Sequence, residues 1–194
     1  MKLRYFILIS ILATSQIVFS QDWNPVDSVK LALKNTPTIP LSFDKRNSFI
    51  SGNATRIWGI KAGVDYGKVA LLGAFYTASL NENNQNTFDY TYISAIGEYH
   101  WYQSYRFRLY QSIQLGVGVA DEKIGNDYNT HMIFPLETGV SVNVRLLKYF
   151  GLYCGLGARW SMDGVSQFSA PYYTYGIKLL TRDLVRDIKK GTLF

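Results

Sequence analysis

The sequence contains one cysteine, Cys154, and two histidines, His100 and His131, among its 194 residues. A single cysteine excludes an internal disulfide. The two histidines fall in different predicted strands and lack the ligand spacing of a zinc site, so we predict no metal and no cofactor. No glycine-rich segment opens a helix, which argues against a phosphate-binding loop.

Long apolar runs are also absent. After the first 20 residues, no uncharged apolar run approaches the ~20 residues that a membrane-spanning helix needs. The first residues have the pattern of an export signal, with Lys2 and Arg4, an apolar run that ends at Ala13 and a small residue at Ser20. We therefore predict a cleaved signal peptide at residues 1–20.

The excess of positive charge is small. Removal of the signal would lower the formal net charge from +6 to about +4, because Lys2 and Arg4 are lost with it. Such an excess is compatible with contact to anionic lipid headgroups. The basic residues are scattered along the chain, which argues against nucleic acid as a partner.

What the sequence does contain is an alternation of apolar and polar side chains with a period of two residues. From Trp58 to Tyr66 the even positions are apolar and the odd positions are glycine or charged. Successive side chains of a strand point to opposite faces, so this pattern predicts strands with one apolar face. Seven strands are predicted, in 56–80 (two strands joined by a turn at 65–68), 92–101, 106–120, 131–146, 149–160 and 172–179.

The second of these strands is ambiguous, because both of its faces are largely apolar. We assign its even positions, Ala70 to Leu80, to the same apolar face as Trp58. The odd positions, including Leu71 and Phe75, are then expected on the opposite face.

The connections between the predicted strands alternate in length. Short ones at 65–68, 102–105 and 147–148 alternate with longer polar ones at 81–87, 121–130 and 161–171. Outer-membrane barrels have this layout, with the short turns on the periplasmic side. Bacterial barrels of this type have an even number of strands, so we predict an eighth strand in "LSFDKRNSFI", residues 41–50, although its alternation is poor.

Alternation alone does not distinguish a membrane barrel from a soluble lipocalin-like barrel, whose apolar face points inward. Two features favour the membrane barrel. The polar face is rich in glycine, which suits the crowded interior of a narrow barrel. The apolar face carries aromatic residues toward the strand ends, as interfacial girdles do. The predicted girdle consists of Trp58, Tyr66, Tyr76, Tyr99, Trp101, Trp160, Tyr173 and Tyr175.

Charged residues of the polar face are expected in the lumen, which side chains fill in an eight-stranded barrel. An unpaired charge there would cost several kcal/mol. We therefore expect Glu98 and Glu137 to be paired with basic neighbours such as Arg108, Arg145 or Arg159. The predicted lumen charge network consists of Lys61, Glu98, Arg108, Glu137, Arg145, Arg159 and Lys178.

The segments "GIKAGVDYG", "LETGVSVNVRLLKYFGLYCGLGARW" and "YYTYGIKL" give the chain a resemblance to the small eight-stranded outer-membrane β-barrel families, the OmpA/OmpX-like and porin-like group. The resemblance covers residues 41–180. It implies an all-β fold, an eight-stranded antiparallel up-and-down transmembrane β-barrel in the outer membrane of a Gram-negative cell, in contact with outer-membrane lipid.

Two terminal segments flank the expected barrel. Residues 21–40 are predicted to be a periplasmic N-terminal segment with a helix over 24–34. Residues 181–194, "TRDLVRDIKKGTLF", depart from these families, which usually end on a strand with a terminal aromatic residue. Leu180, Leu184 and Ile188 have helical spacing, so we expect an amphipathic periplasmic tail that caps the barrel, lies on the inner leaflet, or docks a periplasmic or membrane protein partner.

These features predict a non-enzymatic barrel with a filled lumen and a structural, accessory or adhesion-type role. One alternative is a lipid-modifying hydrolase of the outer leaflet, which would use His131 with Ser161 or Asp163. In lipid A deacylases, however, the histidine and serine stand two positions apart on one strand, and neither histidine here has such a serine. The other alternative is a narrow pore.

Overall fold

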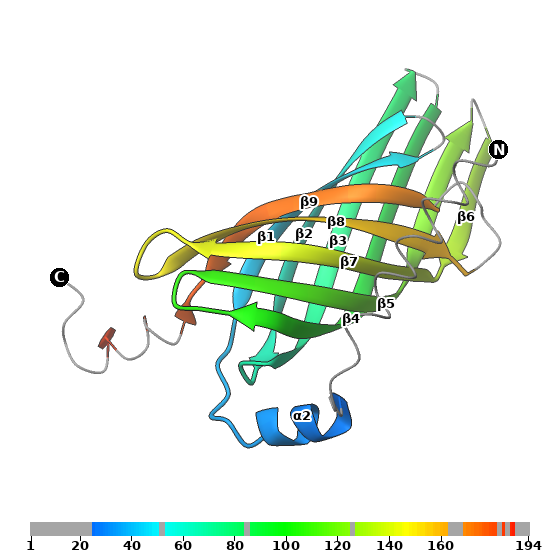
Figure 1. Ribbon diagram of the computed structural model, residues 1–194. Coiled ribbons are helices and arrows are strands. Elements are labelled where there is room, and N and C mark those ends of the chain that lie inside the picture. The colour runs from blue at the N-terminus through cyan, green and yellow to red at the C-terminus, as the bar shows by residue number, and fades with distance from the viewer. Residues whose placement is uncertain are drawn as a thin grey trace, which may run out of the picture.

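The computed structural model describes residues 25–50, 53–83, 86–124, 127–162, 169–181, 184 and 187–188. The predicted signal peptide and most of the predicted tail lie outside these residues. The described elements are shown in Figure 1, and in chain order they are α2 (Pro25–Ala32), β1 (Leu41–Ile50), β2 (Asn53–Asp65), β3 (Val69–Asn83), β4 (Asn86–Gln103), β5 (Phe107–Ile124), β6 (Asp127–Ile133), β7 (Pro135–Arg145), β8 (Phe150–Ser161) and β9 (Ala170–Leu179).

The strands form one closed antiparallel barrel. β6 and β7 are two parts of one wall strand, since both pair with β5, β6 along Gly118–Ile124 and β7 along Phe107–Leu115. β1 pairs with both β2 and β9, which closes the sheet. The barrel therefore has eight wall strands, which confirms the predicted fold class and shows that residues 41–50 form a full strand.

Apolar side chains cover the outside of the barrel, and polar side chains point inward. Along β8 the exposed residues include Leu152 and Leu156, which alternate with the buried Tyr153 and Arg159. Trp58 on β2 is 57% exposed. The apolar face thus points away from the lumen, which is the reverse of a lipocalin-like barrel.

The predicted orientation of β3 is wrong. Leu71 and Phe75 point outward, whereas Ala70, Leu72, Ala74, Tyr76 and Ala78 are buried inside. The reason is the strand pairing across the 65–68 turn, which places Asp65 opposite Ala70. Paired residues share a face, so odd positions of β2 match even positions of β3. Both faces of β3 are apolar, and the sequence pattern alone does not show this change.

β1 owes its poor alternation to charged residues on both faces. Asp44 and Arg46 are buried inside. Lys45 points outward, where its Nζ lies 4.5 Å from the Trp58 ring centroid and 5.6 Å from that of Tyr175. The apolar outer surface of the barrel therefore carries a cation, Lys45, near the middle of this ten-residue strand.

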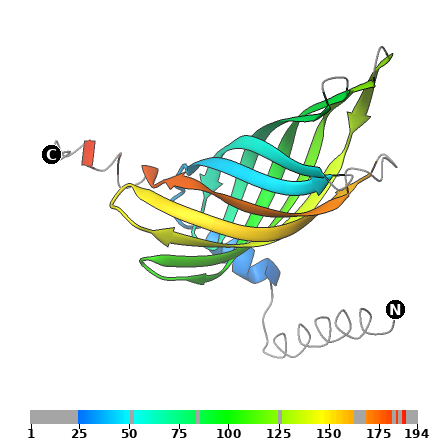
Figure 2. The same cartoon turned by 90° about the horizontal axis from the view of Figure 1, so that it is seen from above.

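Two of the predicted long loops are mostly strand. β3 and β4 stay paired as far as Asn83 and Asn86, and β5 and β6 as far as Ile124 and Asp127. Polar residues of these segments continue the backbone ladder, so polarity alone did not mark a loop. The two hairpins reach furthest at one end of the barrel (Figures 1 and 2).

The opposite end carries the short turns and the terminal segments. α2 agrees with the predicted N-terminal helix, and none of the described helices is long and apolar enough to cross a membrane. The segment after α2 is joined to the β2–β3 turn by paired backbone hydrogen bonds between Thr38 and Asp65, of 2.9 and 2.8 Å. In the C-terminal segment, Leu184 N donates to Leu180 O over 3.3 Å, a helical bond.

Asp187 attaches the C-terminal segment to the β7–β8 turn. Its carboxylate lies 2.7 Å from Lys148 Nζ and accepts a hydrogen bond of 2.9 Å from the Tyr149 hydroxyl. The hydrogen bond with Asp187 raises the pKa of the Lys148 ammonium. Asp187 is thus held against this end of the barrel.

Candidate functional site

Polar side chains at mid-height join all eight wall strands across the lumen. We call this set the lumen hub. Its members are Asp44 and Arg46 of β1, Lys61 of β2, Tyr76 of β3, Tyr92 of β4, Gln114 of β5, Glu137 of β7, Arg159 of β8 and Thr174 of β9.

Arg46 is the centre of the lumen hub. Its Nε donates to Asp44 over 2.9 Å, and its Nη2 donates to Gln114 Oε1 over 3.0 Å. It also donates to Glu137 and to the Tyr76 hydroxyl. One guanidinium therefore joins β1 to the three strands β3, β5 and β7, which its planar array of donors allows.

Glu137 is the second centre. Its side chain is 0% exposed and lies between two arginines, Arg46 on one side and Arg159 Nε at 2.6 Å on the other. Tyr92 donates to it over 2.9 Å. Each carboxylate oxygen has at least one charged donor, so the buried anion is compensated.

Asp44 connects β2 and β9 to the lumen hub. Its Oδ2 accepts a hydrogen bond of 2.8 Å from the Tyr76 hydroxyl and lies 3.3 Å from Lys61 Nζ. Thr174 of β9 donates to its other oxygen. The strands on both sides of β1 are thus joined through one carboxylate.

The lumen hub holds three cations and two anions, and tyrosine rings take up part of the excess charge. Arg46 lies 4.0 Å from the Tyr76 ring centroid, and Lys61 Nζ lies 4.5 Å from that of Tyr153. The space beside Tyr92 and Arg159 has a volume of about 10 Å³, at the lower limit for one water molecule. At this level the lumen is packed rather than open.

Inward glycines make room for the tyrosine rings. A Cβ atom on Gly59 would lie 2.2 Å from the Tyr76 ring, and one on Gly157 would lie 2.4 Å from the Tyr172 ring. Any larger residue would displace a ring that packs in the lumen. The glycine-rich polar face of the sequence is therefore a packing requirement of the lumen tyrosines.

The residues of the predicted lumen charge network do not all lie together. Lys61, Glu137 and Arg159 belong to the lumen hub. Glu98 and Lys178 are buried closer to the short-turn end. The lining of a cavity at that end includes Arg108, Arg145 and Lys178.

Glu137 is paired with Arg159, one of its expected partners. Glu98 has none of the three named arginines as a salt-bridge partner. Its Oε2 lies 3.6 Å from His100 Nε2, and the base that acts on it most strongly is Lys178 of the same predicted network. Arg108 pairs with Asp65 over 2.8 Å, and Arg145 donates to the Lys148 carbonyl over 2.7 Å. Strand tilt separates residues that seemed level in the sequence, so mid-strand position alone did not select the pairs.

Asp44 and Arg46, which the sequence analysis missed, contribute most of the contacts in the hub. In "FDKRNS" each of four consecutive residues is charged or amide-bearing, which hid the alternation. Closure of the barrel predicted a strand there, and a strand in a filled barrel must supply inward polar groups. Together these two arguments could have placed Asp44 and Arg46 in the lumen.

The predicted girdle residues lie mainly on the outside. Trp58, Trp101, Trp160, Tyr173 and Tyr175 are exposed, but Trp58 and Tyr175 lie in mid-strand beside Lys45 rather than toward a strand end. Tyr66 and Tyr99 are half-buried, and Tyr99 packs edge-on against Trp101 with ring centroids 5.1 Å apart. Tyr76 is 0% exposed and belongs to the lumen hub, so its assignment to the girdle is wrong.

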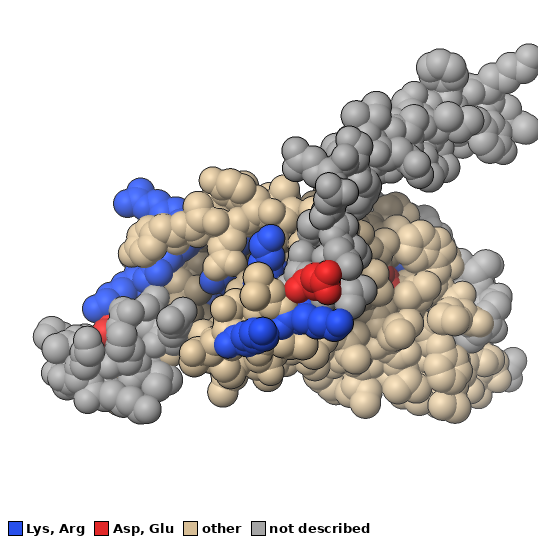
Figure 3. Space-filling model, turned by 60° about the horizontal axis from the view of Figure 1, so that its bottom comes forward, with Lys and Arg blue, Asp and Glu red and all other residues tan. Residues whose placement is uncertain are grey.

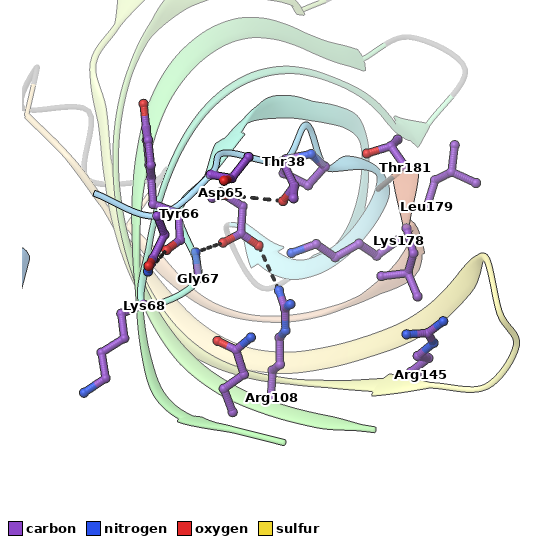
Figure 4. Close-up of a pocket in the computed structure, with 15 residues that line it drawn as sticks. Thr38, Asp65, Tyr66, Gly67, Lys68, Arg108, Arg145, Lys178, Leu179 and Thr181 are labelled. Carbon is purple, nitrogen blue, oxygen red and sulfur yellow. Dashed lines mark hydrogen bonds and ion pairs between the residues drawn. The ribbon is translucent and has the colours of Figure 1, made fainter. Parts of the chain in front are cut away.

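A cavity of about 650 Å³ opens at the end of the barrel that carries the short turns. We call it the turn-side vestibule. Its wall includes the β2–β3 turn, Arg108 at the start of β5, Arg145 at the end of β7 and Lys178 near the end of β9 (Figure 4). No residue of the lumen hub lines it, so it ends below the packed level.

Solved structures of small barrels are similar to this chain over nearly their whole length. Neisserial surface protein A has a TM-score of 0.59 and 12% identity, with 75% of this chain and 99% of that chain covered. For the N-terminal β-barrel domain of Pseudomonas aeruginosa OprF the values are 0.55, 12%, 75% and 97%. For Ail, the attachment invasion locus protein of Yersinia pestis, they are 0.52, 13%, 74% and 96%.

The chain has the fold of the small eight-stranded outer-membrane β-barrels. At 12–13% identity this likeness concerns the fold alone. No protein-family model matches the chain, and no curated protein matches it in sequence.

Within this barrel fold, the residues considered for hydrolysis do not converge. Ser161 pairs with Pro135 in the β7–β8 ladder, and His131 lies four residues beyond Pro135 along the same wall strand. At about 3.3 Å per residue, the two backbones are on the order of 13 Å apart along the strand, beyond hydrogen-bond reach. Asp163 lies outside the described residues. Among the described residues, no group of three or more His, Cys, Asp or Glu side chains could hold a metal.

Proposed function

We propose that the protein is a non-enzymatic barrel of the outer membrane with a side-chain-filled lumen and a structural or adhesion-type role. The observation that carries this proposal is the lumen hub, which joins all eight wall strands through buried side chains. A barrel built in this way is held closed by its own interior. Its packed lumen argues against an open channel, and among the described residues His131 and Ser161 do not converge.

Location in the outer membrane is supported by the outward face of the strands. Apolar residues such as Leu156 and Phe75 cover it, and aromatic residues such as Trp101 and Trp160 lie toward the strand ends. In a closed barrel the backbone N–H and C=O groups of the strands are hydrogen-bonded within the sheet, as a lipid environment requires. Lys45 and Arg56 are outward cations among these strands, and Lys45 lies against two aromatic rings.

An adhesion-type role is supported by the end opposite the short turns. There the β3–β4 and β5–β6 hairpins extend the wall beyond the other strands, so backbone-paired structure stands at the surface. Two of the similar proteins are described as a surface protein and an attachment invasion locus protein. We propose that contacts with other molecules are made at these hairpins.

Cell fractionation followed by gel migration tests the location and the closed barrel together. We expect the protein in the outer-membrane fraction, with faster migration of the unheated sample in SDS because the barrel stays folded. A soluble periplasmic protein that shows no shift on heating would contradict the proposal.

A lipid-modifying activity is tested by replacing the two residues considered for it. We expect His131→Ala and Ser161→Ala to leave the acylation of outer-membrane lipid unchanged, as measured by mass spectrometry, because these residues stand apart on the wall. A change in the lipid profile in both variants would show that the protein is an enzyme.

A further inference from the structure

The turn-side vestibule is lined by more cations than anions. Among the described residues, Lys68, Arg108, Arg145 and Lys178 line it, together with the carboxylate of Asp65. Asp65 and Arg108 are paired over 2.8 Å, and the described part of the lining has more basic than acidic side chains. Lys and Arg side chains are prominent on this face of the molecule (Figure 3). Its field favours negatively charged ligands.

Lys178 is the most deeply placed of these cations. It is 4% exposed, and its ammonium points into the vestibule toward the Asp65–Arg108 pair (Figure 4). Across the part of the chain that the structure describes, its Nζ has no carboxylate within 4.0 Å. Glu98 and Lys178 act on each other more strongly than any other charged group acts on either, but Glu98 is not in salt-bridge contact with the ammonium and lies 3.6 Å from His100 Nε2. A buried ammonium without a close anion costs free energy, and an anion bound at its tip would lower that cost.

The vestibule is formed before any ligand arrives. The Thr38–Asp65 backbone pair fixes one side of the rim. Asn35 Nδ2 donates to the Tyr66 carbonyl over 3.0 Å, which holds the same side against the β2–β3 turn. Little conformational entropy needs to be lost when a ligand enters such a cavity.

The size of the cavity and the positions of its cations indicate what would fill it. The volume of about 650 Å³ falls within the usual range for ligand pockets and is far larger than one carboxylate or phosphate needs. Arg108, Arg145 and Lys178 come from three different strands and lie at separate places around the space (Figure 4). A ligand with several spaced negative groups can meet them together, whereas a single ion cannot.

We propose that the turn-side vestibule binds an acidic peptide, with side-chain or terminal carboxylates at Lys178, Arg108 and Arg145. The site is closed above by the packed lumen, so the peptide enters and leaves at the same mouth. This inference goes beyond the proposed function, since binding to the purified barrel does not depend on where the barrel lies in the cell.

A binding titration on the folded full-length chain tests this site. The probe is pentaglutamate, the barrel is held in nanodiscs of neutral phosphatidylcholine, and binding is followed by calorimetry at low salt. We expect Lys178→Met and Arg145→Gln each to weaken binding by about tenfold, because each removes a charge-assisted contact. Lys123→Gln, an exposed lysine of β5 away from the vestibule, is the matched control and should bind as the unaltered chain does.

Two variants keep the result interpretable. Arg145 is only half-buried, so Arg145→Gln should fold even if loss of the buried Lys178 disturbs the barrel, and faster unheated gel migration shows which variants are folded. Equal binding by the unaltered chain and both folded variants would overturn the proposal, as would the absence of any binding. Phosphatidylglycerol vesicles and inorganic phosphate are tested as competitors of the bound peptide. If either binds the site as strongly as the peptide does, the site takes phosphate groups, which would overturn the assignment to a peptide.

Discussion

Glu137 shows what a single buried carboxylate does in this lumen. It compensates both Arg46 and Arg159, and no part of its side chain is exposed. Removal of one partner from such a group leaves the other charges buried without an anion, which costs more than the pair itself contributes. Glu137 therefore stabilises the barrel mainly by preventing that cost.

Glu137→Gln should lower the free energy of unfolding by about 3 kcal/mol, since Arg46 and Arg159 would lose their shared anion. Urea titration of the barrel in lipid vesicles measures this change. Asp89→Asn, at an exposed carboxylate of β4, is the control and should change stability by less than about 0.5 kcal/mol. Equal stability of the two variants would show that the buried charges are not compensated through Glu137.

Glycine substitution tests the packing of the lumen rings. Gly59→Ala should destabilise the barrel by about 1–3 kcal/mol, because the new methyl group would overlap the Tyr76 ring in the hub. Gly97→Ala is the matched control, since its Cβ would meet nothing within 4 Å on the outward face. The control should keep or slightly raise stability in the same urea titration. If Gly59→Ala behaves like Gly97→Ala, the ring does not occupy the position described.

Sequence reasoning at the level of single residues succeeded where the alternation was clean. The inward positions of Glu137 and Arg159 follow from the apolar residues on either side of them in β7 and β8. Arg46 was missed because its neighbours Lys45 and Asn47 are polar on the outward face. Which acid meets which base depends on strand tilt and register across the lumen, and no local pattern records these.

Among the elements, β1 has the largest departure from the outward apolar pattern. Lys45→Leu should raise the free energy of unfolding in vesicles by about 1–2 kcal/mol. A lysine at the bilayer midplane costs about 2–4 kcal/mol, and its cation–π contacts with Trp58 and Tyr175 return only part of this, about 0.5–2 kcal/mol.

The control for this change is Lys123→Leu, at an exposed lysine in the upper part of β5, where little effect on stability is expected. A loss of stability in Lys45→Leu would mean that Lys45 meets an anion within the membrane. Such a result would show that this stretch of β1 does not face hydrocarbon alone.

β3 shows the limit of pattern reading at the element scale. A strand whose two faces are both apolar can satisfy either orientation, and the pairing of Asp65 with Ala70 decided between them. The hairpin extensions were missed for a related reason. Backbone pairing can continue through polar residues, so the polar segments 81–87 and 121–130 gave no sign of where the strands end.

For the molecule as a whole, closure was predictable and the packed state of the lumen was predictable only in outline. Even strand number required an eighth strand, and an eight-stranded barrel has an interior that side chains can fill. The network that fills it depends on residues from every strand at once. The residues that make up this network could therefore be identified only from the three-dimensional structure.

The packed lumen predicts that the barrel does not conduct ions. Purified protein inserted in a planar bilayer should give no single-channel steps, because the lumen hub joins all wall strands at mid-height. Steady conductance in the unaltered chain would support a narrow pore instead. Protein from the same preparation, reconstituted in vesicles and digested with protease, serves as a control for insertion.

The orientation of the two strand faces underlies every conclusion drawn from the barrel, and Cys154 allows it to be measured without any substitution. Cys154 is the single cysteine of the chain and lies exposed on the outward face of β8. A spin label attached to it before folding into vesicles should show high accessibility to oxygen and low accessibility to a water-soluble nickel chelate. High accessibility to the chelate and low accessibility to oxygen would show that this face meets water, and would contradict the membrane barrel described.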